Sequence, residues 1–276
     1  MRLATLFIII ICMLFYGFGV NHTTQIFVEF HRLKVSNVVC FSADNLGNIY
    51  TANSNGDIVK YDKEGTKTAV ANNKLLGNVF SIDASNPFEI YVFYKEQNKV
   101  IYYDNQLNML GQSNLEEGGF LMLSTLARSY DGKIWLFDQS DMKLKKVKKD
   151  LNLELSSGNV RDYANNPQFA PVYIGDMNNA IYLFDSTSGL YEFDNFGNFV
   201  RTIELTNASQ FFVMSGKMYF LKNNAIYLLD KTFLQEKSIP IENKPEQIAA
   251  FTLSPDRMVL QSGNELILYA LTNKNK

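Results

Sequence analysis

Short apolar runs separated by polar turns recur along the chain about every 40 residues. Each unit opens with one such run, at residues 38–41, 79–82, 121–126, 172–174, 211–214 and 248–253. Runs that are rich in β-branched and aromatic residues and bounded by Gly, Asn, Asp and Pro predict β-strands. Repetition at this period predicts an architecture built from equivalent units.

Three further strands are predicted within a unit. The second carries pairs of the Ile-Tyr type, at residues 49–50, 90–91, 134–135, 181–182, 218–219 and 258–259. The third ends at Asp62, Asp104, Asp150, Asp194 and Asp230, and at Ala270 in the sixth unit. A fourth, more polar strand follows in five units, at residues 66–71, 108–112, 152–155, 199–205 and 236–241. Six units whose innermost strand is the most apolar predict an all-β fold, a six-bladed β-propeller with four-stranded blades.

The two ends of the chain complete this prediction. The sixth unit supplies strands at residues 247–254, 257–261 and 265–271, but no fourth strand follows. Residues 24–30 have a strand pattern and precede the first unit. We expect this N-terminal strand to pair with residues 265–271 in the last blade, which would close the ring and cover that sheet edge.

Composition is consistent with one large core. The chain has 276 residues, of which 46% are hydrophobic and 13% aromatic. No linker or composition shift divides it, so residues 20–276 are predicted to form a single propeller domain. Most of the aromatic side chains are expected to pack between blades.

Residues 1–19 have the pattern of a signal peptide. Arg2 is followed by a charge-free apolar stretch, and Gly17 and Gly19 occupy the small-residue positions that precede a cleavage site. We expect an exported protein in the periplasm or at the periphery of the outer membrane, without a membrane span after cleavage.

Two other interpretations of this segment remain open. The apolar stretch approaches the ~18 residues that span a bilayer, so it could remain as an anchor. Lipidation at Cys12 is a third interpretation, although the preceding Ile11 is not the small residue that such a signal requires.

Candidate catalytic chemistry is sparse. The histidines are His22 and His31, both in or beside the predicted N-terminal strand, and the cysteines are Cys12 and Cys40. None of these residues has metal-ligand spacing, and no nucleophile elbow or phosphate loop occurs. We therefore predict no catalytic residues, no metal and no cofactor. Removal of Cys12 with the signal peptide would leave Cys40 as a buried strand residue without a disulfide partner.

Acidic turns at residues 44–48, 130–133 and 194–198 could suggest calcium loops. Each lacks the further carboxylates and the bidentate Glu of such a loop. Asx-turns, in which the Asp side chain accepts hydrogen bonds from its own turn, are the preferred interpretation.

The stretch from Asp44 to Tyr50, followed by residues 56–62, resembles the repeat of NHL-type and related six-bladed propellers, and residues 189–197 carry a similar stretch. The chain as a whole is most similar to short secreted propellers from Bacteroidetes-type bacteria. The resemblance implies a fold and not an activity.

Some propeller relatives are enzymes. Resemblance to gluconolactonase-like hydrolases would imply an axial divalent metal, for which Asp83 and Asp176 are the nearest carboxylates. Resemblance to streptogramin lyases would imply active-site histidines, but His22 and His31 lie near the N-terminal strand. Neither set is complete, so the chain is predicted not to be an enzyme.

The candidate binding residues lie in the longest predicted connection, at residues 156–168. Arg161, Asp162 and Tyr163 are predicted to contact a protein partner, since Arg and Tyr are enriched at interaction hot spots. The alternative is a solvated crossing between blades.

One basic cluster interrupts an otherwise balanced charge pattern. Residues 143–149 contain five lysines, which favours an outer strand with exposed basic positions. Attraction of an anionic headgroup or another polyanion is the alternative. A net charge of −2 and the predicted export disfavour nucleic-acid binding.

The predicted function is that of a secreted, non-catalytic protein-binding or scaffolding module of the cell envelope. Its partner would be one or more proteins, with an outer-membrane assembly or secretion complex as one candidate. A small-ligand or carbohydrate-binding sensor is the alternative, and a propeller hydrolase or lyase comes third.

Overall fold

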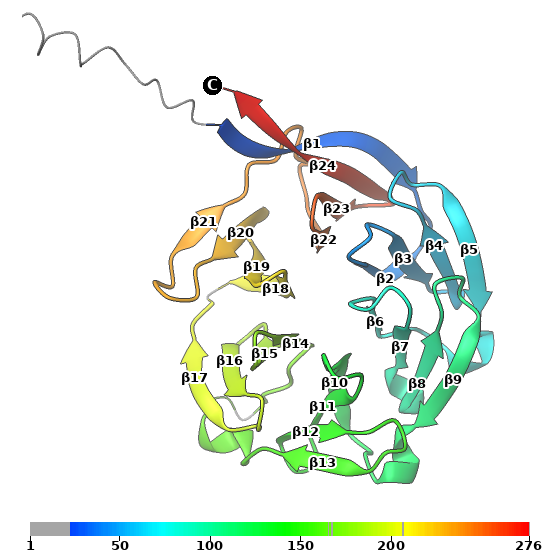
Figure 1. The fold of residues 1–276 in the computed structure, drawn as a ribbon, viewed down its shortest axis with the longest axis vertical. Helices are drawn as coiled ribbons and strands as arrows, with labels where there is room; N and C mark the ends of the chain where they lie inside the picture. The colour runs from blue at the N-terminus through cyan, green and yellow to red at the C-terminus, as the bar shows by residue number, and fades with distance from the viewer. Residues whose placement is uncertain (1–22, 165, 167, 206, 276) are drawn as a thin grey trace, which may run out of the picture.

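The computed structural model describes residues 23–275 except 165, 167 and 206, so the predicted signal peptide at residues 1–19 lies outside the described residues. Six four-stranded antiparallel sheets are arranged radially around one axis (Figure 1). The protein is an all-β, six-bladed β-propeller, which confirms the fold that the repeat predicts.

The first three blades follow one another along the chain. Blade 1 contains β2 (Val38–Ala43), β3 (Ile49–Asn53), β4 (Asp57–Tyr61) and β5 (Lys67–Asn72). Blade 2 contains β6 (Ser81–Asp83), β7 (Ile90–Tyr94), β8 (Lys99–Tyr103) and β9 (Met109–Asn114). Blade 3 contains β10 (Leu123–Arg128), β11 (Ile134–Asp138), β12 (Lys143–Val147) and β13 (Leu153–Ser156).

The remaining blades complete the ring. Blade 4 contains β14 (Tyr173–Met177), β15 (Ala180–Asp185), β16 (Gly189–Asp194) and β17 (Phe199–Ile203). Blade 5 contains β18 (Ala208–Met214), β19 (Lys217–Lys222), β20 (Ala225–Leu229) and β21 (Glu236–Ser238). Blade 6 contains β22 (Ala250–Ser254), β23 (Arg257–Ser262), β24 (Glu265–Asn275) and β1 (Thr23–Lys34). Short 3₁₀ turns occur at η2 (Lys74–Leu76), η3 (Lys95–Gln97), η4 (Leu115–Gly118) and η5 (Val160–Asp162).

The predicted N-terminal clasp is present as the antiparallel pair β1–β24. Phe27 lies opposite Leu271, and the pairing extends beyond the predicted residues 24–30 to Lys34 opposite Glu265. A register shift between Glu29 and His31 bends β1 along the rim. The first and last strands of the chain therefore complete one sheet.

The core lies between the blades. Each cluster of buried side chains combines residues of two neighbouring sheets, as where Tyr50 and Ile58 of blade 1 pack with Ile90 and Val92 of blade 2. Because both faces of a blade are covered, the second strands β7, β11 and β15 are buried at every position. This explains why these strands are continuous apolar runs rather than alternating ones.

The acidic turns are Asx-turns, as predicted. Asp44 Oδ1 accepts hydrogen bonds from the backbone N–H groups of Leu46 and Asn48, both at 2.9 Å. Asp194 does the same with Phe196 and Asn198 at 2.9 and 2.8 Å. In each turn, the Asp carboxylate thus accepts hydrogen bonds from backbone N–H groups of the same turn.

The prediction of a solvated outer strand at residues 143–149 is wrong. Residues 143–147 form β12, the third strand of blade 3, and β13 pairs along its outer side, while only Lys148 and Lys149 beyond the strand are exposed. Lys145 is 9% exposed and Lys146 is 4% exposed. The run of lysines alone predicts exposed side chains, because the acidic residues that pair with Lys145 and Lys146 lie outside this run, at Asp131, Asp138 and Asp141.

Ion pairs neutralise these buried lysines. Lys145 Nζ lies 2.8 Å from both Asp138 and Asp141, and Lys146 Nζ lies 2.9 Å from Asp131. Burial alone would raise the pKa of Asp138, but hydrogen bonds from Lys145 and Ser140 outweigh it and hold the pKa below its ordinary value. The pair therefore stabilises the fold above about pH 4, and its contribution is lost as the pH falls through the pKa of folded Asp138.

We expect deletion of residues 24–30 to open the ring and lower the melting temperature. Phe27 is 8% exposed and packs with Tyr219 and Tyr269, so Phe27→Ala should by itself lower the free energy of unfolding by about 3–4 kcal/mol. The matched control is Phe30→Ala, since Phe30 is 39% exposed on the same strand. Differential scanning calorimetry measures both, and an unchanged melting temperature after the deletion would rule out the clasp.

Lys145→Met should lower the free energy of unfolding at pH 7 by about 3 kcal/mol, because it leaves Asp138 buried without its ammonium partner. Lys148→Met, at an exposed position next to the same strand, should change it by under about 0.5 kcal/mol. Urea unfolding compares the two variants. Equal effects would show that the buried ion pair contributes little.

Candidate functional site

An axial channel is the main concavity of the described structure. The segments that enter the inner strands, such as residues 73–80 and 115–122, lie on one face of the disc, here named the crossing face. The turns that follow the inner strands, such as residues 44–48 and 84–89, lie on the other, the turn face. The channel runs between them past β2, β6, β10, β14, β18 and β22.

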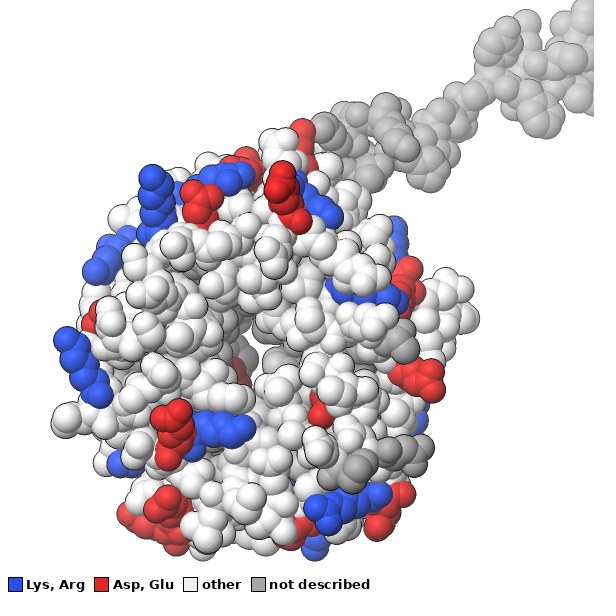
Figure 2. All heavy atoms as spheres, turned by 180° about the vertical axis from the view of Figure 1, so that it is seen from behind, with Lys and Arg blue, Asp and Glu red and all other residues white. Residues whose placement is uncertain are grey.

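Three connected cavities form this channel. The cavity nearest the crossing face has a volume of about 180 Å³, the middle one about 150 Å³ and the one nearest the turn face about 290 Å³. Ser42 and Tyr173 line both the first and the middle cavity, while Asp176 and Ser85 line both the middle and the last. Figure 2, which looks onto the crossing face, shows the central hollow.

Hydrogen bonds between neighbouring blades surround the channel, and each joins a side chain to the backbone of the next inner segment. They are Cys40 Sγ to Val79 O (3.9 Å), Arg128 N to Asp83 Oδ2 (2.7 Å), Thr125 Oγ1 to Val172 O (3.3 Å), Val213 N to Tyr173 Oη (3.2 Å), the two bonds between Gln210 and Phe251 (both 2.9 Å), and Ala43 N to Thr252 Oγ1 (3.2 Å). All six blade interfaces are joined in this way. Polar side chains near the axis therefore hold the ring together.

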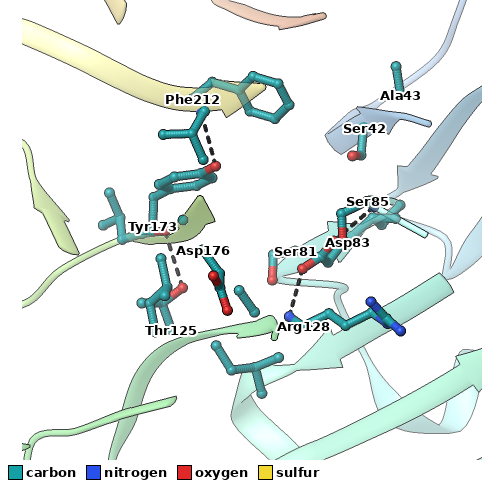
Figure 3. Close-up of a pocket in the computed structure, with 17 residues that line it drawn as sticks. Ser42, Ala43, Ser81, Asp83, Ser85, Thr125, Arg128, Tyr173, Asp176 and Phe212 are labelled. Carbon is teal, nitrogen blue, oxygen red and sulfur yellow. Dashed lines mark hydrogen bonds between the residues drawn. The ribbon is translucent and has the colours of Figure 1, made fainter. Parts of the chain in front are cut away.

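Asp83 and Asp176, which the sequence places near the inner strands, line the same middle cavity (Figure 3). Asp83 accepts hydrogen bonds from the backbone N–H groups of Ser85 (2.9 Å) and Arg128 (2.7 Å). Its carboxylate thereby links blade 2 to blade 3.

Asp176 links blade 4 to blade 3. Its Oδ2 accepts from the Ser129 hydroxyl at 2.8 Å, from Tyr130 N at 3.2 Å and from the Trp135 indole N–H at 3.1 Å. The Trp135 ring in turn lies 5.2 Å from the ammonium group of the buried Lys146. A chain of contacts thus connects the axis with the ion pairs of β12.

Cys40 lines the channel at its crossing-face end. Burial raises the pKa of its thiol to about 12, which disfavours the nucleophilic thiolate. The thiol acts as a weak donor to Val79 O, so Cys40 is a packing residue of β2, as the sequence suggests.

The predicted binding residues Arg161 and Asp162 lie in η5 on the crossing face. Asn159 caps this turn by accepting a hydrogen bond from Arg161 N at 2.9 Å. Val160 is fully buried in the core between blades 3 and 4, so it anchors the turn and leaves both charged side chains exposed.

Tyr163 follows directly and is 38% exposed. Its ring stacks on Phe199 of blade 4, with centroids 4.2 Å apart and an interplanar angle of 7°. The three predicted residues are therefore adjacent and accessible, but they lie away from the channel lining. Their role in partner binding stays a prediction.

Four exposed apolar residues lie on the crossing face at or just before the starts of inner strands, and they are here named the apolar mouth. It consists of Val39, Leu121, Met122 and Val172, which are 45%, 61%, 58% and 48% exposed. Figure 2 shows a largely uncharged surface around the hollow, with a few acidic atoms in and beside it and most of the charged side chains nearer the rim. These residues belong to the apolar runs that predict the inner strands. Their sequence pattern is therefore that of buried residues, and only the structure shows that they are exposed.

The described residues hold no group of three or more His, Cys, Asp or Glu side chains arranged to bind a metal ion. Across residues 23–275, leaving out 165, 167 and 206, no helix is long and apolar enough to cross a bilayer.

No protein-family model and no curated protein matches the sequence. Solved propellers do match the fold. A Bacteroides fragilis protein provisionally described as exported is 14% identical, with a TM-score of 0.55 over 93% of this chain and 98% of that one. A chain in the mitotic checkpoint complex is 12% identical, with a TM-score of 0.57 over 88% and 95% of the two chains.

An inactive histidine variant of virginiamycin B lyase from Staphylococcus aureus, solved with quinupristin, is also similar. It is 13% identical, with a TM-score of 0.58 over 85% of this chain and 80% of that chain. At these identities the likeness shows a shared β-propeller fold alone.

We expect Gln210→Leu to lower the free energy of unfolding by about 1–3 kcal/mol, because it leaves the N–H and C=O groups of Phe251 without their partner at the interface of blades 5 and 6. The control is Gln112→Leu on the exposed side of β9, which should change it by under about 0.5 kcal/mol. Thermal and urea unfolding measure both. A Gln210→Leu variant as stable as the control would show that the inter-blade bonds are dispensable.

Proposed function

We propose that this protein is an exported, non-catalytic β-propeller whose crossing face binds a protein partner and holds it in an envelope assembly. The apolar mouth around the channel carries this proposal. Exposed apolar patches bordered by polar residues are typical of protein interaction sites. The neighbouring turn with Arg161, Asp162 and Tyr163 would extend the contact toward the rim.

The chemistry of the axis supports a binding role over a catalytic one. Asp83, Thr125 and Gln210 are occupied in bonds between blades. His31 lies exposed on the rim strand β1. In the similar virginiamycin B lyase a histidine substitution removes activity, and the described part of this chain offers no axial histidine as a counterpart.

Two comparisons agree with the proposed location and partner class. A similar propeller from Bacteroides fragilis is described as exported, and another belongs to a multiprotein checkpoint complex. The exported neighbour and the signal-peptide pattern of residues 1–19 support a role in the periplasm or at the periphery of the outer membrane.

The test uses tagged full-length protein recovered from detergent-solubilised envelopes. The variant Leu121→Asp/Met122→Asp places two charges in the apolar mouth and should weaken partner binding at least about 30-fold, which corresponds to the loss of a hot spot. The control is Phe196→Asp, since Phe196 is 67% exposed on the turn face.

Partner identity comes from mass spectrometry of the co-purified material, and affinity is then measured with the purified partner. Both variants should melt like the parent protein. Recovery of a monomer alone under several solubilisation conditions, or equal partner binding by the mouth variant and the parent, would refute the proposal.

A further inference from the structure

The middle cavity of the channel has the features of a ligand site, and we infer that it binds an alkylammonium group between the carboxylates of Asp83 and Asp176. The two carboxylates lie outside the apolar mouth, which shares only Val172 with the cavity wall, so the inference goes beyond the proposed protein-binding function. The ligand is either a free small amine or the side chain of a lysine.

The two carboxylates enter the cavity from different blades. Asp83 ends β6 of blade 2, and Asp176 lies on β14 of blade 4 (Figure 3). Their hydrogen-bond donors are uncharged N–H and O–H groups, and no Lys or Arg among the described residues forms an ion pair with either. By contrast, the buried Asp138 and Glu192 each have a basic partner.

Asp176 keeps one oxygen available. Its three hydrogen bonds all go to Oδ2, and the described residues place no donor on Oδ1. Since a carboxylate can accept several hydrogen bonds, this oxygen can accept from a ligand without loss of the contacts to Ser129 and Trp135.

Ser42 provides an independent observation that points to a ligand. Its side chain lines the same cavity, is 8% exposed and has no hydrogen-bond partner among the described residues. Figure 3 shows its hydroxyl oxygen turned toward the cavity. The hydroxyl is open to the cavity and keeps its hydrogen-bonding capacity, so it can accept a hydrogen bond from a donor bound there.

Arg128 is the only basic residue in the described cavity lining, and it pairs with Glu89, which also pairs with Lys149, rather than with Asp83 or Asp176. Its backbone N–H contacts Asp83, while its guanidinium donates to Ser129 O at 3.2 Å and lies 3.8 Å from Glu89. Two carboxylates in a narrow, low-dielectric channel therefore create a negative potential that attracts a cation.

The shape of the cavity favours an organic cation over a metal ion. Its volume of about 150 Å³ is roughly ten times what one water requires. Apolar side chains of Ile82, Ala127, Ile174 and Val213 share its wall with the polar groups. Calcium would need six to eight oxygen ligands, whereas an ammonium group has three donors, which match Asp83, Asp176 and Ser42, and an alkyl chain that can pack on the wall.

Calorimetry on the full-length protein tests the site with n-butylammonium, with Nα-acetyl-lysine methylamide and with the neutral analogue 1-butanol. We expect one molecule of each amine to bind with a Kd of about 1 mM or tighter, and 1-butanol at least about 10-fold more weakly. Equal affinity for both amines indicates a free amine as the natural source. Preference for the lysine derivative indicates a lysine side chain of a protein.

Variants identify the residues. Asp176→Asn keeps an oxygen for Ser129 and should weaken amine binding about 10-fold or more, and Ser42→Ala should weaken it less. The control Asp256→Asn, at a turn-face carboxylate whose side chain is 68% exposed, should leave it unchanged. Leu121→Asp/Met122→Asp should also leave it unchanged, which separates this test from that of the proposed function.

Thermal melts confirm that each variant is folded. If Asp176→Asn is unstable, Ser42→Ala provides the same test without disturbing a bond between blades. No amine binding at 10 mM ligand, binding unaffected by both substitutions, or preferential binding of Ca²⁺ over the amines would overturn the inference.

Discussion

Ring closure through the β1–β24 pair is the constraint on which the rest of the structure depends. A blade buries its two faces only when a neighbour stands on each side, and blades 1 and 5 have blade 6 as that neighbour. Blade 6 is completed by a strand from the other end of the chain. Phe27 also exchanges backbone hydrogen bonds with Pro240 and Glu242, so β1 ties blade 6 to the segment arriving from blade 5.

Much of this fold could be predicted from the sequence, because the same spacing recurs six times and each copy supports the others. The Ile-Tyr pairs mark the strands that are buried on both faces, and the acidic turns mark the hairpins between strands. The strand pattern predicts only residues 24–30 of β1, whereas pairing continues past Phe30 because the register shift keeps Lys34 opposite Glu265. A strand end of this kind is set by its partner and not by local pattern.

Less of the candidate site could be predicted, because its features depend on contacts between residues that lie apart in the sequence. From the sequence alone, lysines at positions 145 and 146 predict exposed side chains. Only the structure shows that Asp138, Asp141 and Asp131 lie beside them and allow their burial. Leu121 and Met122 have the sequence pattern of core residues, but the fold leaves them at the channel mouth. Asp83 and Asp176 are 93 positions apart in the sequence, and only the radial arrangement of blades 2 and 4 places them in one cavity.

The position of the clasp also affects how the molecule reaches its native state. Thr272 near the C-terminus bonds to Ile26, 246 residues earlier in the chain. Such a contact carries a large loop-closure cost and cannot form until residues 265–275 have been synthesised. The N-terminal strand must therefore wait, unpaired, while the blades that follow it are made. Until residues 265–275 are available, the exposed edge of this strand has to be kept from pairing with other chains.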